Sequence, residues 1–538
     1  MFLNSILPYE KYRMVATELY FVDKTDLLEE LFPALGKEKR YFCITRPRRF
    51  GKTVMANMVA AYFGNAADSH EIFDTLKISA SVDYEKHLNQ HHVIYIDFSE
   101  VPRDCNNYRQ YIARIQEGLY RDLAGAYPEL KLDGQKGIWD SLTDIFEQKK
   151  QRFIFVFDEW DAVFHMPFIA REDQEQYLLF LKSLLKSKIY VELVYMTGIL
   201  PIVKYSGGSE LNMFAEYNMA TRERFSGYFG FSDKEVDNLF QIYLDAEKNP
   251  RISREDLALW YDGYHTAGGE RLYNPRSVVY ALTDNQLGNY WTGSGPYDEI
   301  FYYIKDHIEE LRDDLALMIS GERVEAKLQE YAVTAERFHT RDQIYSAMVV
   351  YGLLTYEDGR VFIPNKEMMD KYDELLLSNE NLGYVNRLAK ESRRMLKATL
   401  AGDTETMAEI LKYAHDTEAP LLSYNSEAEL SAVVNLVYLA ARDRYRVERE
   451  DKAGEGYVDF IFYPDCKSDD GLILELKIDS TPEEAIRQIK DKNYLLRFRG
   501  KLGEAPKYTG RILLVGISYQ KKTKKHSCRV EAIERKAT

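Results

Sequence analysis

The first two hundred residues alternate between short apolar runs and amphipathic helical segments. Four runs have the length and the β-branched and aromatic content of buried strands: YFCIT, VIYIDF, FIFVF and VELVYMT. A helical segment follows the first run, with Met55 and Val59 one turn apart. Strands that alternate with helices predict an α/β domain with a parallel sheet and a ligand at the carboxyl ends of its strands.

A Gly-Lys-Thr tripeptide at 51–53 joins the first apolar run to its helix. In a phosphate-binding loop, backbone N–H groups face phosphate oxygens, the lysine reaches the terminal phosphates and the threonine ligates Mg²⁺. The usual first glycine is replaced by Arg46, so we expect Pro47 to shape the loop and Arg48 or Arg49 to help neutralise phosphate. A basic turn without a ligand is the alternative. The loop residues predicted to bind nucleotide are Arg46, Pro47, Arg48, Arg49, Phe50, Gly51, Lys52 and Thr53.

Two acidic residues close the third apolar run, as an ATPase requires at its second motif. Asp158 would hold Mg²⁺ with Thr53, and Glu159 would polarise the attacking water. Thr197, at the end of the next run, would read the γ-phosphate, although a β-branched residue also commonly finishes a strand. The run VIYIDFS lies between the two motifs along the chain, which suits the ATPase branch with an additional strand and a glutamate base.

Composition and charge limit the remaining possibilities. The chain has 538 residues, which indicates two to four domains. Its net charge of −15 excludes a general basic field, so any nucleic-acid site must be local. The amino terminus lacks a signal-peptide pattern, no run is long enough to span a membrane, and the four cysteines form no C-x-x-C pair, which together favour the cytoplasm.

The middle of the chain is mainly helical. The segment WYDGYHTAGGERLYNP interrupts the helices, and we expect a packed connector there rather than a lid. Further on, HTRDQIYSAMVVYGLLTYEDGRVFIPN predicts a helix and a hairpin that turns at 357–359, which is compatible with a winged helix. Its acidic tip favours packing over DNA binding. Helices around 402–403 are expected to form a spacer to the last domain.

Several short sequence motifs in the first half resemble the bacterial AAA-ATPase-like family. In order, they are YFVDKTDLLEEL, TRPRRFGKT, DEWDAV, TGIL, FGFSDKEV, WYDGYH and YNPRSVV. The resemblance implies that RPRRFGKT is itself the phosphate loop, so that Arg46 departs only from the general motif. It also implies that Lys52 and Thr53 bind nucleotide and Mg²⁺, and that Asp158 and Glu159 are the Walker B pair. Trp160 stands where this family usually has tyrosine.

A second group of candidate residues occupies the carboxyl-terminal hundred residues. Asp459 lies in the strand YVDFIFY, and Glu475 and Lys477 lie two apart in GLILELKI, hence on one face. Two carboxylates can ligate Mg²⁺, and the lysine can orient or activate water for phosphodiester hydrolysis. Charges inside an apolar strand are costly unless they are used or paired. A helix then begins at Thr481-Pro482.

This arrangement resembles the PD-(D/E)XK nuclease superfamily, often fused to the same ATPase family. The resemblance implies that Glu427 is a carboxylate on the preceding helix and that Gln488 is a supporting polar group. Gln488 and Tyr494 are six apart, so exonuclease behaviour is not inferred. A structural cluster in an inactive nuclease fold is the alternative. The lysines at 521, 522, 524 and 525 would suit a phosphate backbone, although a solvated hairpin tip is the more common explanation.

We therefore predict a P-loop ATPase domain of the ASCE type at 1–230, a helical and winged-helix-like middle at 231–420, and an α/β restriction-endonuclease-like domain at 421–538. ATP would gate a Mg²⁺-dependent nuclease that acts on DNA rather than RNA, with a bacterial defence role by analogy. A regulatory ATPase with an inactive nuclease fold is the rival. A ring-forming motor is a third possibility; it would require an arginine finger, which is not assigned and for which Arg222 and Arg224 are candidates.

Overall fold

The computed structural model describes two compact units. The described residues are 1–103, 105–202, 211–220, 222, 224–291, 307–319, 321–328, 340–416, 427–453, 456–464, 466, 468–498 and 508–533. The first unit comprises Met1–Ile300 with Glu325–Met368, and the second comprises Phe301–Val324 with Met369–Thr538. In the described part of the chain, no helix is both long and apolar enough to cross a bilayer.

A five-stranded parallel sheet forms the centre of the first unit, in the order β2-β3-β4-β1-β5. The strands are β1 (Tyr41–Thr45), β2 (His92–Asp97), β3 (Phe153–Asp158), β4 (Val191–Gly198) and β5 (Ala215–Tyr217). The strand that separates the phosphate-loop strand β1 from the acidic strand β3 is therefore β4, whereas β2 lies at the edge. The predicted ASCE arrangement is confirmed, but its additional strand is β4; the prediction that VIYIDFS, which forms β2, supplies this strand is wrong.

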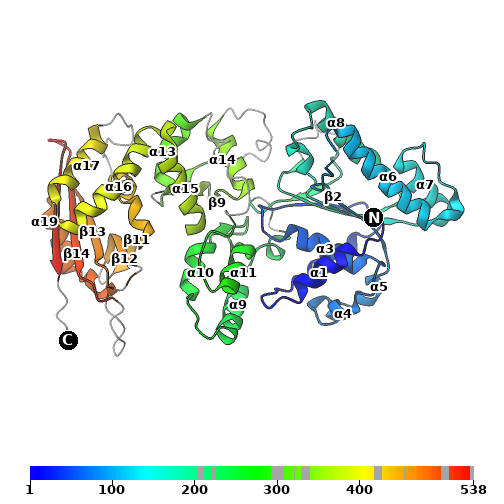
Figure 1. Cartoon of the computed structure of the whole chain (residues 1–538), viewed down its shortest axis with the longest axis horizontal. Coiled ribbons are helices and arrows are strands. Elements are labelled where there is room, and N and C mark those ends of the chain that lie inside the picture. The colour runs from blue at the N-terminus through cyan, green and yellow to red at the C-terminus, as the bar shows by residue number, and fades with distance from the viewer. Residues whose placement is uncertain are drawn as a thin grey trace. The chain divides into compact units, whose positions relative to one another are not determined.

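Helices cover both faces of this sheet (Figure 1). One face packs against α1 (Leu7–Ala16) and α3 (Lys52–Phe63), and the other packs against α6 (Tyr108–Ala126), α7 (Ile138–Lys149) and α8 (Arg171–Leu185). The central strands are apolar on both faces because each face is covered, which explains why the sequence shows continuous apolar runs rather than alternation. The predicted α/β architecture is confirmed.

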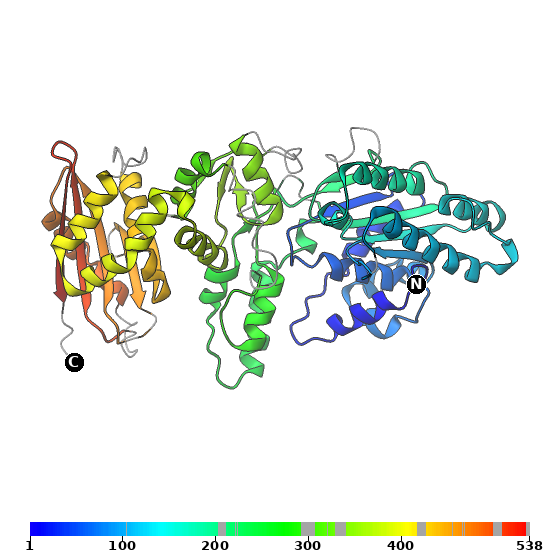
Figure 2. The same cartoon turned by 45° about the horizontal axis from the view of Figure 1, so that its top comes forward.

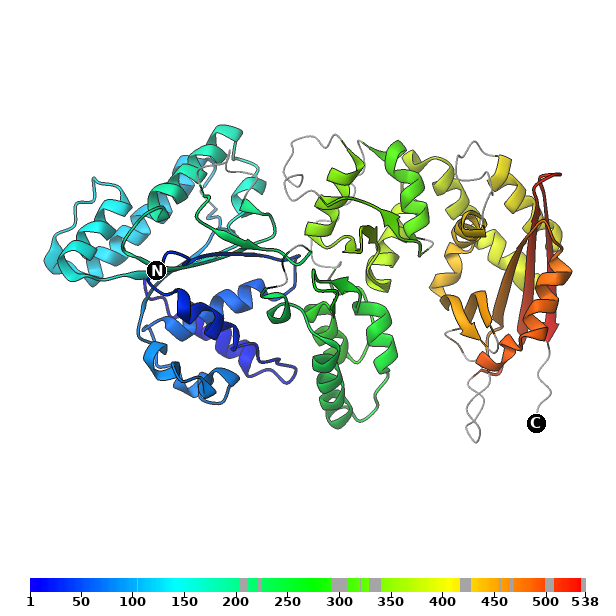
Figure 3. The same cartoon turned by 180° about the vertical axis from the view of Figure 1, so that it is seen from behind.

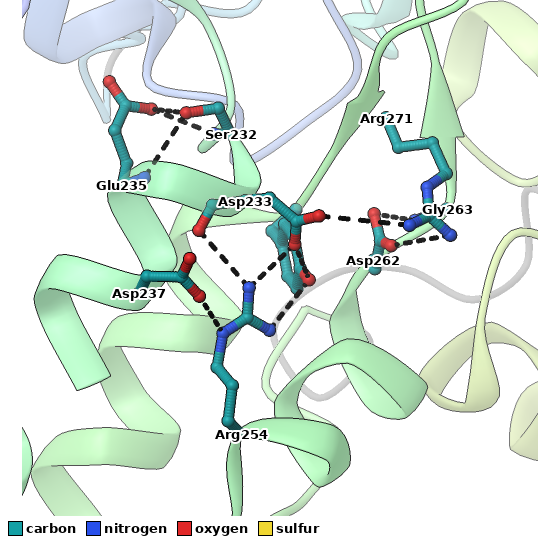
Figure 4. A network of polar contacts seen from close by, with 9 residues as sticks. Ser232, Asp233, Glu235, Asp237, Arg254, Asp262, Gly263 and Arg271 are labelled. Carbon is teal, nitrogen blue, oxygen red and sulfur yellow. Dashed lines mark hydrogen bonds and ion pairs between the residues drawn. The ribbon is translucent and has the colours of Figure 1, made fainter. Parts of the chain in front are cut away.

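Three helices follow the sheet: α9 (Asp233–Ala246), α10 (Arg254–Tyr261) and α11 (Pro275–Asp284). They are the green helices of Figure 2. Ser232 and Ser253 cap α9 and α10 through capping boxes. The guanidinium of Arg254 bridges Asp233 at 2.7 Å and Asp237 at 2.6 Å (Figure 4). This network joins the start of α10 to the first turn of α9 and fixes the angle between the two helices.

The later part of the first unit contains the predicted helix and hairpin. Helix α14 (Arg341–Tyr351) precedes the antiparallel strands β9 (Thr355–Glu357) and β10 (Arg360–Phe362). Asp358 and Gly359 form the two-residue turn with φ of 46° and 80°, as a tight hairpin requires. The expected connector also contains a short hairpin, β6 (Tyr264–His265) with β7 (Arg271–Leu272), and it is packed rather than open because Tyr264 is buried.

The second unit contains another five-stranded sheet, in the order β11-β12-β13-β14-β15. Its strands are β11 (Tyr445–Ala453), β12 (Gly456–Pro464), β13 (Gly471–Ile478), β14 (Ile512–Gln520) and β15 (Lys525–Ile533). Only the β13–β14 pairing is parallel, since α19 (Pro482–Asp491) connects these two strands. As Figure 3 shows, α19 packs against the sheet.

Additional helices of this unit are α13 (Ile308–Ile319), α16 (Tyr384–Ala401), α17 (Thr404–Asp416) and α18 (Glu427–Val437). Helix α15 (Lys366–Ser378) begins in the first unit and ends in the second. The expectation that the helices around 402–403 form a spacer is wrong. Helix α17 packs on β15, and α16 packs on α17 and α18, because their apolar faces complete the core around the sheet.

Candidate functional site

The predicted phosphate loop connects β1 to α3. Gly51 caps the helix with a φ of +87°, which favours glycine, and Arg49 also has a positive φ of 68°. The ammonium group of Lys52 is buried and donates to the carbonyl oxygens of Arg46 and Pro47, each at 3.1 Å. Burial lowers the pKa of Lys52, and the nearby carboxylate of Glu159 opposes this effect. The loop thus curls around its own lysine.

Arg46 does not take the predicted place beside the nucleotide. Its guanidinium is buried beneath the loop, where Nη1 donates to the carbonyl oxygens of Thr45 at 2.7 Å and Tyr217 at 2.8 Å. The ring of Phe229 lies 4.9 Å from the guanidinium carbon. Since its hydrogen bonds hold β1 to β5, the side chain of Arg46 is a structural anchor. It occupies the glycine position of the general motif without contacting the phosphate side.

The middle of the chain supports the loop from outside. Pro47 packs against Gly352, the residue that ends α14 with a φ of +78°; a Cβ atom at Gly352 would lie 2.7 Å from Cβ of Pro47. Phe50 is buried and meets the ring of Tyr264 edge-on, with 5.0 Å between ring centroids. These contacts explain how the loop keeps its shape although it lacks the first glycine.

Trp291 adds a polar contact to the same loop. Its indole Nε1 donates to the carbonyl oxygen of Arg48 at 2.9 Å, and its backbone N–H donates to Oε1 of Glu367 at 2.6 Å. The other oxygen of Glu367 accepts a hydrogen bond from Ser277 at 2.8 Å. The buried carboxylate of Glu367 therefore connects α11, Trp291 and the first turn of α15 to the phosphate loop.

The acidic end of β3 lies directly beneath the loop. Asp158 is fully buried, and the hydroxyl of Thr197 on β4 donates to its Oδ1 at 2.5 Å. Burial raises the pKa of Asp158 to about 6, and the hydroxyls of Thr197 and Thr53 limit the rise because they stabilise the ionised form. The predicted Mg²⁺ ligands Thr53 and Asp158 are thus brought together. Because Thr197 is hydrogen-bonded to Asp158, it positions this carboxylate.

Glu159, the predicted general base, directly follows Asp158 in the chain. It has a positive φ of 49° and lines the cavity above the loop, and burial raises its pKa. A positive φ at a glutamate is unfavourable and is often retained where function requires it. Its backbone N–H donates to Oδ1 of Asp158 at 3.1 Å, so the two acids are held together while Glu159 lines the cavity.

Asp161 was not identified from the sequence. It is buried, and its Oδ2 accepts hydrogen bonds from the backbone N–H groups of Ile199 at 3.0 Å and Leu200 at 2.8 Å. It therefore fixes the turn that follows β4. The sequence does show a third acidic residue two positions after Glu159. A single acidic residue in a loop, however, does not indicate which backbone N–H groups it will bind.

A cavity of about 1050 Å³ opens above the loop, at the upper end of the range for small-molecule sites. The predicted residues that line it are Arg48, Arg49, Phe50, Gly51, Lys52, Thr53 and Glu159. Aromatic and aliphatic side chains from two other parts of the unit, including Tyr20, Phe21, Val279 and Tyr280, provide apolar walls. A floor formed by the predicted phosphate loop and apolar walls fit a nucleotide.

The cavity also contains an arginine that sequence reasoning missed. Arg276, in the first turn of α11, lines the cavity and stacks on Tyr280 with the guanidinium carbon 4.5 Å from the ring centroid. Of the two candidates named from the sequence, Arg224 instead forms an ion pair with Glu30 at 3.0 Å. Neither Arg222 nor Arg224 is among the residues that line the cavity. Arg276 could not be predicted from the sequence, because it lies more than two hundred residues after the phosphate loop and only the tertiary fold brings α11 to the cavity.

The second site lies on one face of the sheet of the second unit. Lys477 places its Nζ 3.2 Å from Oε1 of Glu475, and Gln488 of α19 donates to the same oxygen. Asp459 of β12 accepts the backbone N–H of Leu476 at 2.6 Å through Oδ2. The structure therefore brings four predicted residues together from two strands and one helix.

Electrostatics at this site resemble those of a cation-binding carboxylate. Glu475 is 2% exposed; burial and the neighbouring carboxylate of Asp459 raise its pKa to about 7, and Lys477 opposes the rise. Its second oxygen, Oε2, accepts no hydrogen bond from the described residues. A buried acceptor oxygen beside a second carboxylate fits a divalent cation.

The remaining predicted catalytic residue of this site is the helix carboxylate Glu427. It is the first residue of α18, but its side chain lies outside the described part of the structure. Among the side chains that are described, no group of three or more His, Cys, Asp or Glu could hold a metal ion by itself. Asp459 and Glu475 are thus a pair, and Mg²⁺ bound by one or two carboxylates usually keeps several waters and substrate oxygens.

Comparisons with known proteins match two separate parts of the chain, one around each of the two sites. Residues 8–206 match the family described as predicted AAA-ATPase, and residues 427–527 match the PD-(D/E)XK nuclease superfamily. An uncharacterized protein from the vnfD 5' region of Azotobacter chroococcum mcd 1 is 24% identical over 525 residues, which cover 94% of this chain and 93% of the relative.

Similar solved structures include the Walker-type ATPase PABY2304 of Pyrococcus abyssi, with a TM-score of 0.34, 14% identity, and coverage of 65% of this chain and 94% of that one. The Aeropyrum pernix ORC1 protein in complex with DNA has a TM-score of 0.27, 15% identity, and coverage of 65% and 91%. The two family matches and the two sheets carry the identification: the chain combines a domain of the predicted AAA-ATPase family with a domain of the PD-(D/E)XK nuclease superfamily.

Proposed function

We propose that the protein is a nucleotide-gated nuclease, in which an ATPase domain controls Mg²⁺-dependent hydrolysis of phosphodiester bonds, in DNA rather than RNA. The observation that carries the proposal is the convergence of Asp459, Glu475, Lys477 and Gln488 on one face of the second sheet. An inactive fold has no need to keep a buried glutamate, a lysine and a second carboxylate together in an apolar strand, where they cost stability.

Each side chain of the second site has a role in this proposal. Asp459 and Glu475 would hold Mg²⁺, which polarises the phosphate and lowers the pKa of a bound water. Lys477, 23% exposed, would orient the attacking water and stabilise the negative charge that develops on the phosphate. Gln488 would fix the orientation of Glu475, since its amide donates to Oε1 of that carboxylate.

At the first site, Lys52, Arg48 and Arg49 would bind the phosphates of ATP, and Thr53 with Asp158 would hold its Mg²⁺. Glu159 would orient the attacking water. The contacts from Pro47 and Trp291 to other parts of the first unit support a gating role, because a change in the loop must be transmitted to the elements that pack against it.

The rival function is a regulatory ATPase whose carboxyl-terminal domain is inactive. To separate the two, purified protein is incubated with linear DNA, circular DNA and RNA, in Mg²⁺ or Mn²⁺, with and without ATP. We expect Lys477→Ala to abolish cleavage and leave ATP hydrolysis unchanged, and Lys52→Ala to abolish the effect of ATP on cleavage. Lys397→Ala, an exposed lysine on α16, is the matched control. Turnover of ATP without cleavage of any substrate would support the rival.

A further inference from the structure

We propose that the hairpin tip between β14 and β15 is a docking surface for the phosphodiester backbone of a DNA substrate. The lysine turn, as we name it, consists of Lys521, Lys522, Lys524 and Lys525. The inference rests on the proposed nuclease function and adds to it the surface that positions the nucleic acid.

The register of the sheet places the lysine turn beyond the nuclease site. Lys477 of β13 pairs with Ser518 of β14, and Ile478 pairs with Tyr519. Strand β14 ends at Gln520, two residues past Ser518, and Gln520 pairs with Lys525. A strand advances about 3.3 Å per residue, so the lysine turn begins about 7 Å past the level of Lys477 along the strand direction. Since a duplex rises about 3.4 Å per base pair, a duplex that reached both points would extend about two base pairs from the scissile phosphate.

Hydrogen bonds fix the turn to the loop that leaves the nuclease strand. The side chain of Gln520 donates to the carbonyl oxygen of Ser480 at 2.6 Å, and the backbone N–H of Lys521 donates to Asp479 at 2.9 Å. Ser480 and Asp479 connect β13 to α19, which carries Gln488. The lysine turn is thus held at a constant position relative to the catalytic residues, as a docking surface requires.

Three residues of the lysine turn, Lys522, Lys524 and Lys525, are available for a ligand. All four lysines are exposed, and in the described structure Lys522, Lys524 and Lys525 form no ion pair. Basic residues elsewhere on this surface are neutralised: Lys490 pairs with Glu531 at 2.5 Å and Arg529 pairs with Glu483 at 3.3 Å. In a chain of net charge −15, Lys522, Lys524 and Lys525 form a local site for a polyanion.

Protection of an edge strand is the competing explanation, because β15 lies at the edge of the sheet and lysines discourage pairing of exposed edges. Only Lys525 belongs to β15, however, as its first residue. The other three lysines precede the strand. Lysines placed to block the edge would lie along the ladder, whereas these lie beyond its end, on the side toward which the strand of Lys477 runs.

The test measures binding of a labelled DNA duplex and an RNA duplex of the same sequence to the full-length Lys477→Ala protein, which keeps the substrate intact. Lys522→Glu with Lys524→Glu is compared with Lys397→Glu and Lys412→Glu, two exposed lysines on α16 and α17. We expect weaker binding only for the first pair, for every base sequence, and a plot of log K against log salt that is less steep by about 2.

Equal affinity and equal salt dependence in the two double variants would overturn the docking surface while leaving the nuclease proposal in place. The absence of binding to either duplex by the parent protein would overturn both. Aggregation of the Lys522/Lys524 variant, seen by light scattering, together with unchanged binding would assign the lysines to edge protection. Binding of the RNA duplex without binding of the DNA duplex would overturn DNA as the occupant of the lysine turn.

Discussion

At the scale of single residues, the burial of Asp158 lowers the stability of the folded protein and favours the binding of a cation. Asp158 is fully buried, and its ordinary pKa of 3.8 is raised to about 6 by burial. An ionised carboxylate in that position costs free energy until a cation neutralises it. Its unfavourable burial is what makes the residue a good ligand, because the same desolvation strengthens its attraction to Mg²⁺.

Replacement of this carboxylate tests whether its burial lowers the free energy of unfolding. In EDTA and without nucleotide, the folded state binds more protons than the unfolded state between about pH 4 and pH 6, so the wild-type protein loses stability as pH rises through that window. We expect Asp158→Asn to unfold at a higher denaturant concentration than wild type at pH 8, by up to about 3 kcal/mol, and to lose this advantage near pH 4.

Denaturant unfolding at pH 8 and at the lowest pH where both proteins fold measures the difference. Asp97→Asn, at the end of the neighbouring strand β2, is the matched control and should change little at either pH. The same Asp158→Asn protein should hydrolyse no ATP. A loss of stability of equal size at both pH values would show that the charge of Asp158 carries no cost.

At the scale of elements, the phosphate loop depends on contacts from α14 and the β6–β7 hairpin. Gly352→Ala tests this dependence, because the added Cβ would lie 2.7 Å from the ring of Pro47. We expect nucleotide affinity to fall on the order of tenfold, about 1.4 kcal/mol, as the loop is displaced. Titration with a fluorescent ATP analogue measures the affinity.

The effect of the clash with Pro47 must be distinguished from the effect of placing alanine in a left-handed backbone conformation. Gly402→Ala provides the comparison, since Gly402 also ends a helix, with a φ of +72°, and has no heavy atom within 4 Å of an added Cβ. Both variants should lose about 1 kcal/mol of stability from the left-handed conformation, but only Gly352→Ala should lose nucleotide affinity. Equal affinities would mean that the loop holds its shape without α14.

At the scale of the whole molecule, the first unit itself supplies an arginine to the cavity above the phosphate loop. Arg276 of α11 lines the cavity and lies in the same unit as the phosphate loop. An arginine supplied by the same chain removes the need for a neighbouring subunit to complete the site. We therefore expect ATP turnover per chain to stay constant over a wide range of protein concentration.

Steady-state ATP hydrolysis at increasing protein concentration, with light scattering in the same samples, measures this expectation. Arg276→Ala should reduce turnover, whereas Arg224→Ala, which removes an ion pair to Glu30 outside the cavity, should have little effect. Turnover per chain that rises with concentration, together with a larger particle in ATP, would instead favour the ring-forming motor.

Local patterns determined much of this protein from the sequence. The apolar runs, the Gly-Lys-Thr helix start and the paired acids predicted the first sheet and placed Lys52, Thr53, Asp158 and Glu159 correctly around one end of it. The spacing of Glu475 and Lys477 predicted their shared face. These features follow from periodicity and chain order, which depend only on neighbouring residues.

Tertiary structure alone decided the features that depend on distant segments. The buried position of Arg46, the support of the loop by Gly352 and Trp291, and the presence of Arg276 in the cavity all arise where residues far apart in sequence meet. Side-chain type does not reveal whether an arginine near a loop will face a ligand or a buried carbonyl. That choice is made by packing, because the free energy of burial depends on every neighbour that the complete fold supplies.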